Sequence, residues 1–344
     1  MTSGADHTAA PLLRVDDVVV EYPRRGLPPM RALAGVSLEI APGEIVGIVG
    51  ESGCGKSTLA RAITGLAAAH SGSVSFDGTA VGTMRRRRRD PGLLPLQMVF
   101  QDPNASLNPR RTVGAQIQEV VVARDRARGV TRTRRDPRAA REAAEALRRV
   151  GLPDGAAEKY PHEFSGGQRQ RAAIARALAS RPKMIVADEP VSALDASAQA
   201  AVANLLRDLS REEGIALAFI SHDLAVVGAL ADRVVVMYLG RVVEEGTVEQ
   251  IWNAPQHPYT QALLAAVPVP DGTGTRPRAL TGEVPDPGSP PPGCRFHPRC
   301  PLAVDRCRAE EPPLRDPGTA AGDTAGTRVA CWVAQAHAPA GAAT

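Results

Sequence analysis

Short apolar runs alternate with longer helix-compatible segments over most of the chain. Four such runs lie at 45–49, 96–100, 184–187 and 215–221. Runs of this length are too short for a helix and are typical of buried parallel strands. Because helix-compatible segments follow them, the pattern predicts an α/β fold built on a parallel sheet.

The remaining pattern predicts further strands and a helical insert. The additional strands are expected at 12–21, 35–40, 73–77, 234–238 and 241–244. The last two should pair as a hairpin around Leu239 and Gly240. A loop is expected at 24–30, which contains Gly26, Pro28 and Pro29. Residues 113–150 are polar and rich in Ala and Arg, which favours a helical insert outside the sheet.

Composition narrows the class of protein. The 344 residues are 43% hydrophobic, enough to bury a large core. The net charge of +4 is too small to indicate a nucleic-acid partner, and the five arginines at 85–89 lack interleaved aromatics, so they are interpreted as a solvated loop. No stretch has the ~20 uninterrupted apolar residues of a membrane span, and residues 1–10 lack a signal pattern. The chain is expected in the cytoplasm, with any membrane role exerted through a partner.

Changes in composition also suggest domain boundaries. Residues 1–11 are expected to form a flexible tail. Residues 268–293 are dense in Pro and Gly, which excludes a regular element and predicts a linker into a small cysteine-bearing tail. The main domain is therefore placed at 12–268, with its helical part at about 113–165. The linker and extension occupy 269–344.

A glycine-rich loop at 50–58 carries the clearest chemistry. It has the form G-x-x-x-x-G-K-[ST] and lies between the strand 45–49 and a helix-compatible run at 59–66. That context is typical of a phosphate-binding loop rather than a chance glycine turn. Backbone N–H groups would surround a polyphosphate, Lys56 would reach its β- and γ-phosphates, and Ser57 would offer its hydroxyl to Mg²⁺. The predicted ATP-binding residues here are Gly50, Ser52, Gly53, Gly55, Lys56, Ser57 and Thr58.

Two acidic residues end the strand at 184–187. Asp188 at the end of a buried strand beside the loop is suited to hold Mg²⁺. The adjacent Glu189 is suited to polarise an attacking water as general base. The simpler interpretation, that Asp-Glu-Pro only ends a strand, is weak beside a phosphate loop.

A second anion-binding feature lies at 165–170. Small residues at a helix N-terminus form an anion site, here roughly 110 residues from the first loop. His222 follows the strand 215–221 and could contact a γ-phosphate. Taken alone, a histidine after a strand is more often structural.

Together these motifs resemble the nucleotide-binding subunit of an ATP-binding cassette (ABC) transporter, whose motifs match in order over about 12–268. The resemblance implies a P-loop NTPase (RecA-like) core with a parallel sheet, an antiparallel β subdomain, a helical insert and a small C-terminal extension. The matches are the Walker A loop at 50–58, the Q-loop at Gln101, the signature at 165–168, the Walker B strand at 184–189, the D-loop at 192–195 with Asp195, and the switch His222. Tyr22 stands where the family stacks an aromatic ring on adenine, although it could equally pack on the sheet.

The resemblance also implies a mechanism. Two cassettes close head to tail around two ATP molecules, and the signature of each caps the γ-phosphate bound by the other. The residues that would act in trans are Ser165, Gly166, Gly167 and Gln168. Gln101 would help bind Mg²⁺ and pass closure to the helical insert, which touches the membrane subunits. Catalysis would rest on Glu189, with Lys56, Gln101 and His222.

Further stretches are similar to the ATPases of oligopeptide/dipeptide importers, and more to the second of their two paired ATPases. They are 101–103, 105–110, 160–164, 237–240 and 257–260. The implied partners are a second ABC ATPase subunit in a heterodimer, two transmembrane permease subunits and an extracytoplasmic solute-binding protein, with no nucleic acid. The chain would lie peripherally on the cytoplasmic face of the membrane. The alternatives are an ATPase for nickel or oligosaccharide import, an exporter ATPase, a soluble cassette ATPase acting on nucleic acid or ribosomes, and a pure nucleotide-binding regulator.

Four of the five cysteines lie in the last fifth of the chain. Their spacing, C-x5-C-x6-C-x23-C, matches neither a zinc ribbon nor a ferredoxin. The family resemblance implies a possible [4Fe–4S] cluster on Cys294, Cys300, Cys307 and Cys331. Zinc, or partly buried thiols without metal, are the alternatives. Cys54 stands apart in the phosphate loop.

Overall fold

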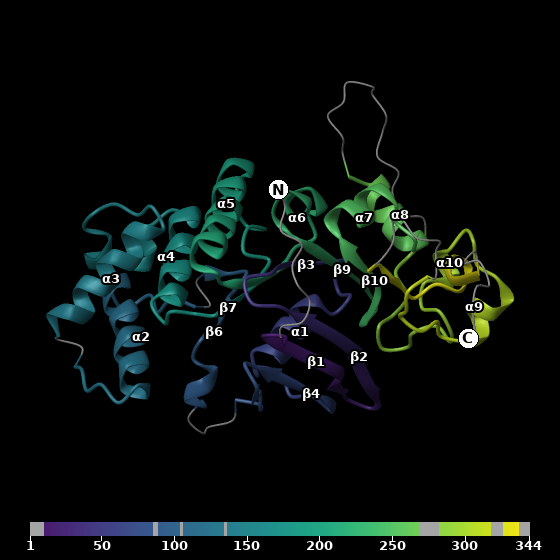
Figure 1. Cartoon of the computed structure of the whole chain (residues 1–344), viewed down its shortest axis with the longest axis horizontal. Helices are drawn as coiled ribbons and strands as arrows, with labels where there is room; N and C mark the ends of the chain where they lie inside the picture. The colour runs from purple at the N-terminus through teal and green to yellow at the C-terminus, as the bar shows by residue number, and fades with distance from the viewer. Residues whose placement is uncertain are drawn as a thin grey trace.

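A seven-stranded sheet forms the centre of the computed structural model, which describes residues 10–84, 89–103, 106–133, 136–267, 282–317 and 326–336 (Figure 1). Its order is β11-β10-β9-β3-β8-β7-β6. The strands are β3 (Ile45–Val49), β6 (Leu96–Val99), β7 (Met184–Asp188), β8 (Ala216–Ile220), β9 (Arg233–Tyr238), β10 (Arg241–Thr247) and β11 (Arg328–Val329). The five strands from β9 to β6 are parallel, and β10 and β11 add antiparallel pairs at one edge. The predicted parallel sheet is confirmed.

Helices cover the central sheet because its strands are apolar on both faces. Every residue of β3, β7 and β8 is buried. The covering helices are α1 (Lys56–Ile63), α4 (Gly166–Leu178), α5 (Ala196–Glu213) and α6 (Leu224–Leu230). A fully buried strand needs apolar neighbours on each side, which is the usual condition of parallel strands.

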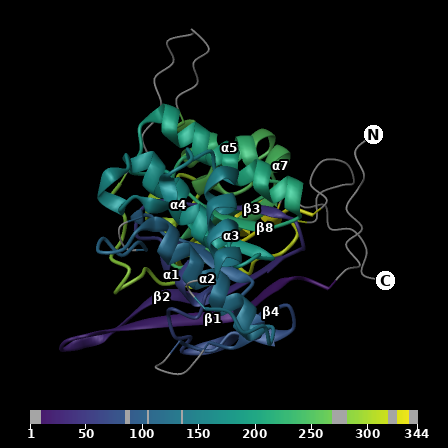
Figure 2. The same cartoon turned by 90° about the vertical axis from the view of Figure 1, so that its left-hand side faces the viewer.

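A second, antiparallel sheet of order β2-β1-β4-β5 packs against α1 (Figures 1 and 2). Its strands are β1 (Leu13–Arg24), β2 (Leu27–Ile40), β4 (Ser71–Phe76) and β5 (Thr79–Ala80). The predicted loop at 24–30 is wrong, because β1 and β2 continue through it to a turn at Arg25 and Gly26. Pro28 and Pro29 fit there because β2 is an edge strand and its register with β1 shifts between the pairs Tyr22–Met30 and Arg24–Leu27, so neither proline belongs to the regular ladder.

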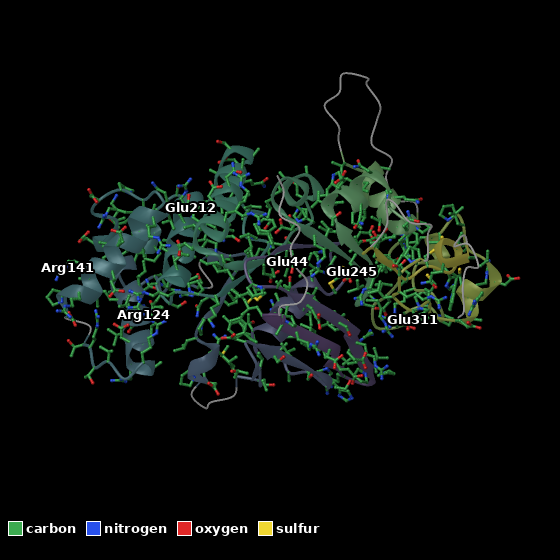
Figure 3. All side chains as sticks on the ribbon, viewed as in Figure 1. Glu44, Arg124, Arg141, Glu212, Glu245 and Glu311 are labelled. Atoms are coloured by element: carbon green, nitrogen blue, oxygen red, sulfur yellow. The ribbon has the colours of Figure 1, made fainter. Side chains whose placement is uncertain are left out.

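The predicted helical insert forms one end of the molecule (Figure 1). It contains α2 (Val113–Ala127), α3 (Pro137–Arg149) and the 3-10 turns η3 (Ala156–Glu158) and η4 (Pro161–Glu163). The buried Arg124, labelled in Figure 3, pairs with Asp125 at 2.7 Å and with Glu142 at 2.7 Å. These charges tie α2 to α3, so the insert is internally braced.

The C-terminal extension forms the opposite end (Figure 1). The chain reaches it through α7 (Val248–Asn253) and α8 (Pro258–Ala265). One further element, the 3-10 turn η1 (Pro91–Leu93), lies just before β6 and is not part of the extension. The extension has η5 (His297–Arg299), α9 (Asp305–Ala309) and α10 (Trp332–Ala336). It also supplies β11, which pairs with β10 at Glu244 and Glu245 and so fixes the extension to the central sheet.

Several sequence predictions fall outside the described residues. They concern the tail at 1–9, the arginine run at 85–88, the linker at 268–281 and the chain end at 337–344. Among the residues that are described, no helix combines the length and the apolar character needed to cross a bilayer.

Candidate functional site

The loop 50–58 joins β3 to α1, as the sequence predicts. Two of its glycines are required by the geometry. Gly50 has a φ of 149°, and a Cβ there would lie 2.2 Å from the carbonyl oxygen of Met237. Gly55 has a φ of 108°, and a Cβ there would lie 2.6 Å from the carbonyl oxygen of Ala32. The loop therefore passes close to β9 and β2 with its backbone exposed for binding.

Lys56 begins α1 and turns its side chain back into the loop. The residue is 4% exposed. Its Nζ donates to the carbonyl oxygens of Gly50 at 2.7 Å and Glu51 at 2.9 Å. A buried ammonium group surrounded by loop carbonyls and backbone N–H groups is a suitable counter-charge for a polyphosphate.

Ser57 and Asp188 meet across the loop and the end of β7. Oγ of Ser57 donates to Oδ1 of Asp188 at 2.8 Å. Burial raises the pKa of Asp188, and the hydrogen bond from Ser57 partly opposes that shift. A hydroxyl and a carboxylate are the oxygen ligands that Mg²⁺ takes from a protein when phosphates supply the others. These two residues therefore fit the predicted Mg²⁺ site.

Glu189 lies at the centre of a polar cluster where β6, β7 and β8 end. Its Oε2 is 3.4 Å from Nε2 of Gln101 and 3.3 Å from Nδ1 of His222. Nε2 of Gln101 also donates to Oγ of Ser192 at 3.2 Å. Glu189 has a φ of 46°, an uncommon conformation for a non-glycine residue that often marks functional sites. The structure thus brings Gln101, Glu189 and His222 together.

The signature segment begins α4, and its side-chain hydrogen bonds do not involve Gln101, Glu189 or His222. Ser165 and Gln168 form a capping box, with Gln168 N to Ser165 Oγ at 3.3 Å and Ser165 N to Gln168 Oε1 at 3.0 Å. Both residues are exposed. Gly167 packs toward Ala198 of α5, the helix whose N-cap is Asp195, which accepts from Ala198 N at 2.9 Å. The signature and D-loop are therefore neighbours on one exposed surface.

Tyr22 lies on β1 and is half-buried against the apolar cluster between the two sheets. The described contacts are those of a residue that packs on the sheet. Stacking on adenine stays a prediction for this residue.

The sequence analysis did not single out three residues that are linked by hydrogen bonds at the phosphate-binding loop. They are Glu51 of the loop and its two partners, Tyr259 and Arg299. Arg299 of the extension donates to both carboxylate oxygens of Glu51, and the backbone N–H of Glu51 donates to the Tyr259 hydroxyl. An acidic side chain inside a phosphate-binding loop was the available signal, because such a charge requires a nearby cation.

The four cysteines of the extension lie close enough to affect one another. Burial raises the pKa of Cys294 to about 12, with smaller contributions from Cys307, Cys331 and Cys300. Over the described residues, no group of three or more His, Cys, Asp or Glu side chains is arranged to hold a metal ion. The predicted [4Fe–4S] cluster is therefore not supported.

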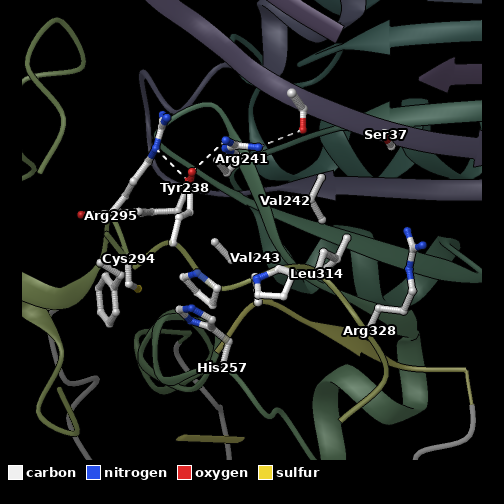
Figure 4. A pocket seen from close by; sticks show the side chains of 16 residues that line it. Ser37, Tyr238, Arg241, Val242, Val243, His257, Cys294, Arg295, Leu314 and Arg328 are labelled. Carbon is white, nitrogen blue, oxygen red and sulfur yellow. Dashed lines mark hydrogen bonds and ion pairs between the residues drawn. The ribbon is translucent and has the colours of Figure 1, made fainter. Parts of the chain in front are cut away.

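A cavity of about 430 Å³ lies between β2, β10 and the extension (Figure 4). Its lining includes Arg241, Val243, His257 and Arg295, and of the predicted site residues it includes Cys294. Glu311 accepts from Arg241 at 2.8 Å and pairs with Arg295 at 3.4 Å, so two of the lining cations already have an acidic partner. The cavity is separate from the candidate phosphate site.

Comparison with known families identifies two matching regions. Residues 33–192 match the ABC transporter family, and residues 243–307 match the oligopeptide/dipeptide transporter C-terminal region. Over 310 residues the chain is 51% identical to the probable peptide ABC transporter ATP-binding protein y4tS of Sinorhizobium fredii, covering 88% of this chain and 86% of that protein. It is 49% identical over 288 residues to the oligopeptide transport ATP-binding protein OppF of Salmonella typhimurium, covering 83% and 84%.

Solved structures agree with this assignment. The fold is similar to that of the ATP-binding cassette MJ0796, a dimer bound to ADP and Pi, with a TM-score of 0.58 and 30% identity. The match covers 69% of this chain and 98% of the cassette. The predicted P-loop NTPase fold is thus confirmed. The chain belongs to the ATP-binding proteins of the ABC transporter family, in the group that carries the oligopeptide/dipeptide transporter C-terminal region.

Proposed function

We propose that the chain hydrolyses ATP to energise the import of peptides through an ABC transporter. The carrying observation is the convergence of Lys56, Ser57, Asp188 and Glu189 at the end of the central sheet. Relatives at 48–51% identity are named for peptide, oligopeptide or di/tripeptide transport, which supports peptides as the imported class.

The proposed chemistry assigns one role to each group. The loop 50–58 binds the phosphates with its N–H groups and Lys56. Ser57 and Asp188 would hold Mg²⁺, with Gln101 as a further proposed ligand, and the ion would supply charge neutralisation on the phosphate oxygens. Glu189 accepts a proton from the attacking water. The water oxygen bonds to the γ-phosphorus and the bond to the β,γ-bridging oxygen breaks, giving ADP and phosphate.

The side chains around Glu189 prepare it for this step. His222 and Gln101 both approach the same carboxylate oxygen, Oε2. They orient that oxygen and limit its freedom before the reaction, which is the main way such sites lower a barrier. His222 would also contact the γ-phosphate.

The proposed assembly follows from the exposed signature. Ser165, Gly166, Gly167 and Gln168 would cap the γ-phosphate of a second ABC ATPase subunit, and Asp195 would lie at the same interface. The insert at 113–165 would contact the two permease subunits. The core domain spans 12–268, the extension 269–344 and the tail 1–11. The chain would lie peripherally at the cytoplasmic face, with an extracytoplasmic solute-binding protein delivering the peptide.

The test is ATP hydrolysis by the full chain assembled with its permease subunits, second ATPase and solute-binding protein in vesicles. Peptides added with the binding protein should stimulate hydrolysis, and Lys56→Ala should abolish ATP binding and turnover. If nickel or an oligosaccharide stimulated hydrolysis and peptides did not, that solute would be assigned as the imported class in place of peptides. Full turnover in the Lys56 variant would contradict the site.

A further inference from the structure

Glu51 connects the phosphate-binding loop to the C-terminal extension. Its carboxylate oxygens accept from Arg299, Nη1 to Oε2 at 2.7 Å and Nη2 to Oε1 at 3.0 Å. The side chain of Arg299 is 3% exposed and that of Glu51 is 22% exposed. A shielded, bidentate arginine–carboxylate pair has fixed geometry and is stronger than an exposed ion pair. It therefore restrains the position of both segments.

Arg299 is held in place by an aromatic cluster. Its guanidinium lies 5.9 Å from the ring centroids of both Tyr238 and Phe296, and Nη1 donates to the Tyr238 hydroxyl at 3.4 Å. Phe296 packs edge-on to Tyr238, with the centroids 5.3 Å apart. Because Tyr238 ends β9 of the central sheet, the extension is anchored to the same sheet that supports the loop.

The backbone of Glu51 has a second anchor. Its N–H donates to the hydroxyl of Tyr259 at 2.8 Å. Tyr259 lies on α8, is fully buried, and packs against Tyr238 with the ring centroids 4.7 Å apart. Glu51 is thus held at both its backbone and its side chain by groups that follow the Walker motifs in sequence.

Glu51 is also hydrogen-bonded to Lys56, the lysine proposed to bind phosphate. Nζ of Lys56 donates to the carbonyl oxygen of Glu51, and also to that of Gly50. Any shift of Glu51 therefore moves an acceptor of Lys56. An unpaired Glu51 carboxylate would in addition place a negative charge inside the loop that must bind a polyanion.

We propose that Arg299 of the C-terminal extension is a positioning residue of the ATP site. It draws the Glu51 carboxylate out of the loop, neutralises it and fixes the acceptor of Lys56, so ATP affinity depends on the docked extension. The inference rests on the proposed role of the loop 50–58. The extension therefore contributes to nucleotide binding without a residue on the nucleotide itself.

The test measures the dissociation constant of a fluorescent ATP analogue with the full-length chain. Arg299→Ala should raise that constant about tenfold, equivalent to about 1.4 kcal/mol. In the assembled transporter the same change should raise KM for ATP more than it lowers kcat. Adding Glu51→Gln to Arg299→Ala should return the constant to within about threefold of wild type, since it removes the unpaired charge.

Control variants distinguish a specific loss of ATP affinity in Arg299→Ala from a general loss of folding. Arg308→Ala removes an exposed arginine of α9 and should leave ATP affinity unchanged. Unchanged affinity in Arg299→Ala, or no recovery in the double variant, would overturn the inference. Failure of wild type itself to bind ATP, or full binding by Lys56→Ala, would instead count against the proposed function of the loop.

Discussion

The two features of this chain that are proposed to bind phosphate, the loop 50–58 and the signature at 165–168, are built in opposite ways. Around the loop 50–58, Lys56 and Asp188 are each 4% exposed, and Lys56, Ser57 and Asp188 bond to neighbouring protein groups. The signature at 165–168 is partly or fully exposed, and its side-chain hydrogen bonds are confined to its own capping box. One feature has its chemical partners within the chain, whereas the other presents a helix N-terminus to solvent.

This difference indicates where each feature acts. Buried polar groups need internal partners, so the loop and the strand ends can be organised before any ligand binds. An exposed helix N-terminus has no such requirement and is free to contact another molecule. The comparison favours the proposed arrangement, in which the catalytic half of the site is complete in one chain and the capping half serves a second subunit.

The largest effect on hydrolysis is expected from a change in the buried half of the site, which comprises the loop 50–58, Asp188 and Glu189. Glu189→Gln should bind ATP with near wild-type affinity while hydrolysis in the assembled transporter falls by about 10²–10³. The amide keeps the shape of the side chain and its contacts with Gln101 and His222 but cannot accept the proton of the attacking water. Binding is measured by titration of a fluorescent ATP analogue, and turnover by phosphate release.

A matched control is Glu212→Gln, the same change at an exposed position of α5 (Figure 3). It should leave both measurements unchanged. Wild-type turnover in the Glu189 variant would remove the general-base assignment and with it the claim that the catalytic half is complete in this chain.

A smaller effect, on hydrolysis but not on ATP binding, is expected from a change in the exposed half of the site, the signature at 165–168. Ser165→Ala should leave ATP binding by the isolated chain within about twofold of wild type. In the assembled transporter it should lower hydrolysis by at least about tenfold, as expected for loss of a hydrogen bond to a charged group. The two measurements distinguish a residue that acts on the partner's nucleotide from one that acts on its own.

Ser165 also caps α4, so its loss costs stability, typically about 1 kcal/mol. Asp136→Ala provides the control, because Asp136 is the N-cap of a different helix, α3, where its side chain accepts from the N–H of Arg138. Equal losses of hydrolysis in the two variants would show that the effect is one of helix stability.

The sequence predicted the buried half well because its signals are local. The glycines at 50–58 and the strand ending at Asp188 each specify a conformation within a few residues. Gln101, Glu189 and His222 follow three different strands, and their meeting was predictable because parallel strands end at the same edge of a sheet.

Contacts between distant segments were not predictable. Glu51 and Arg299 are 248 positions apart, and nothing near Arg299 in the sequence indicates the loop that it binds. The strands through Pro28 and Pro29 were missed for a related reason. Proline excludes a central strand but not an edge strand, and the place of β2 in its sheet is set by tertiary structure.

The smallest expected effect concerns the stability of the buried half without ligand. Burial raises the pKa of Asp188 above its ordinary value of 3.8, so the ionised carboxylate is disfavoured in the folded chain. Asp188→Asn removes that charge, and its amide oxygen can still accept from Ser57. At pH 7, without nucleotide or Mg²⁺, the variant should melt on the order of 2 °C higher, typical for relief of a strained functional group.

The sign of its pH dependence follows from the raised pKa. The cost of the ionised group is absent below pH 3.8, where both folded and unfolded chains carry the protonated acid, and it appears as pH rises through the folded pKa. The gain in Tm should therefore shrink as pH falls from 7 toward 4. With ATP and Mg²⁺ present the order should reverse, because ligand binding stabilises wild type more than a variant that has lost a metal ligand. A lower Tm for the variant at pH 7 without ligand would show that the Asp188 carboxylate stabilises the folded chain. It would contradict the view that the buried half of the site is organised for its ligand at the expense of stability.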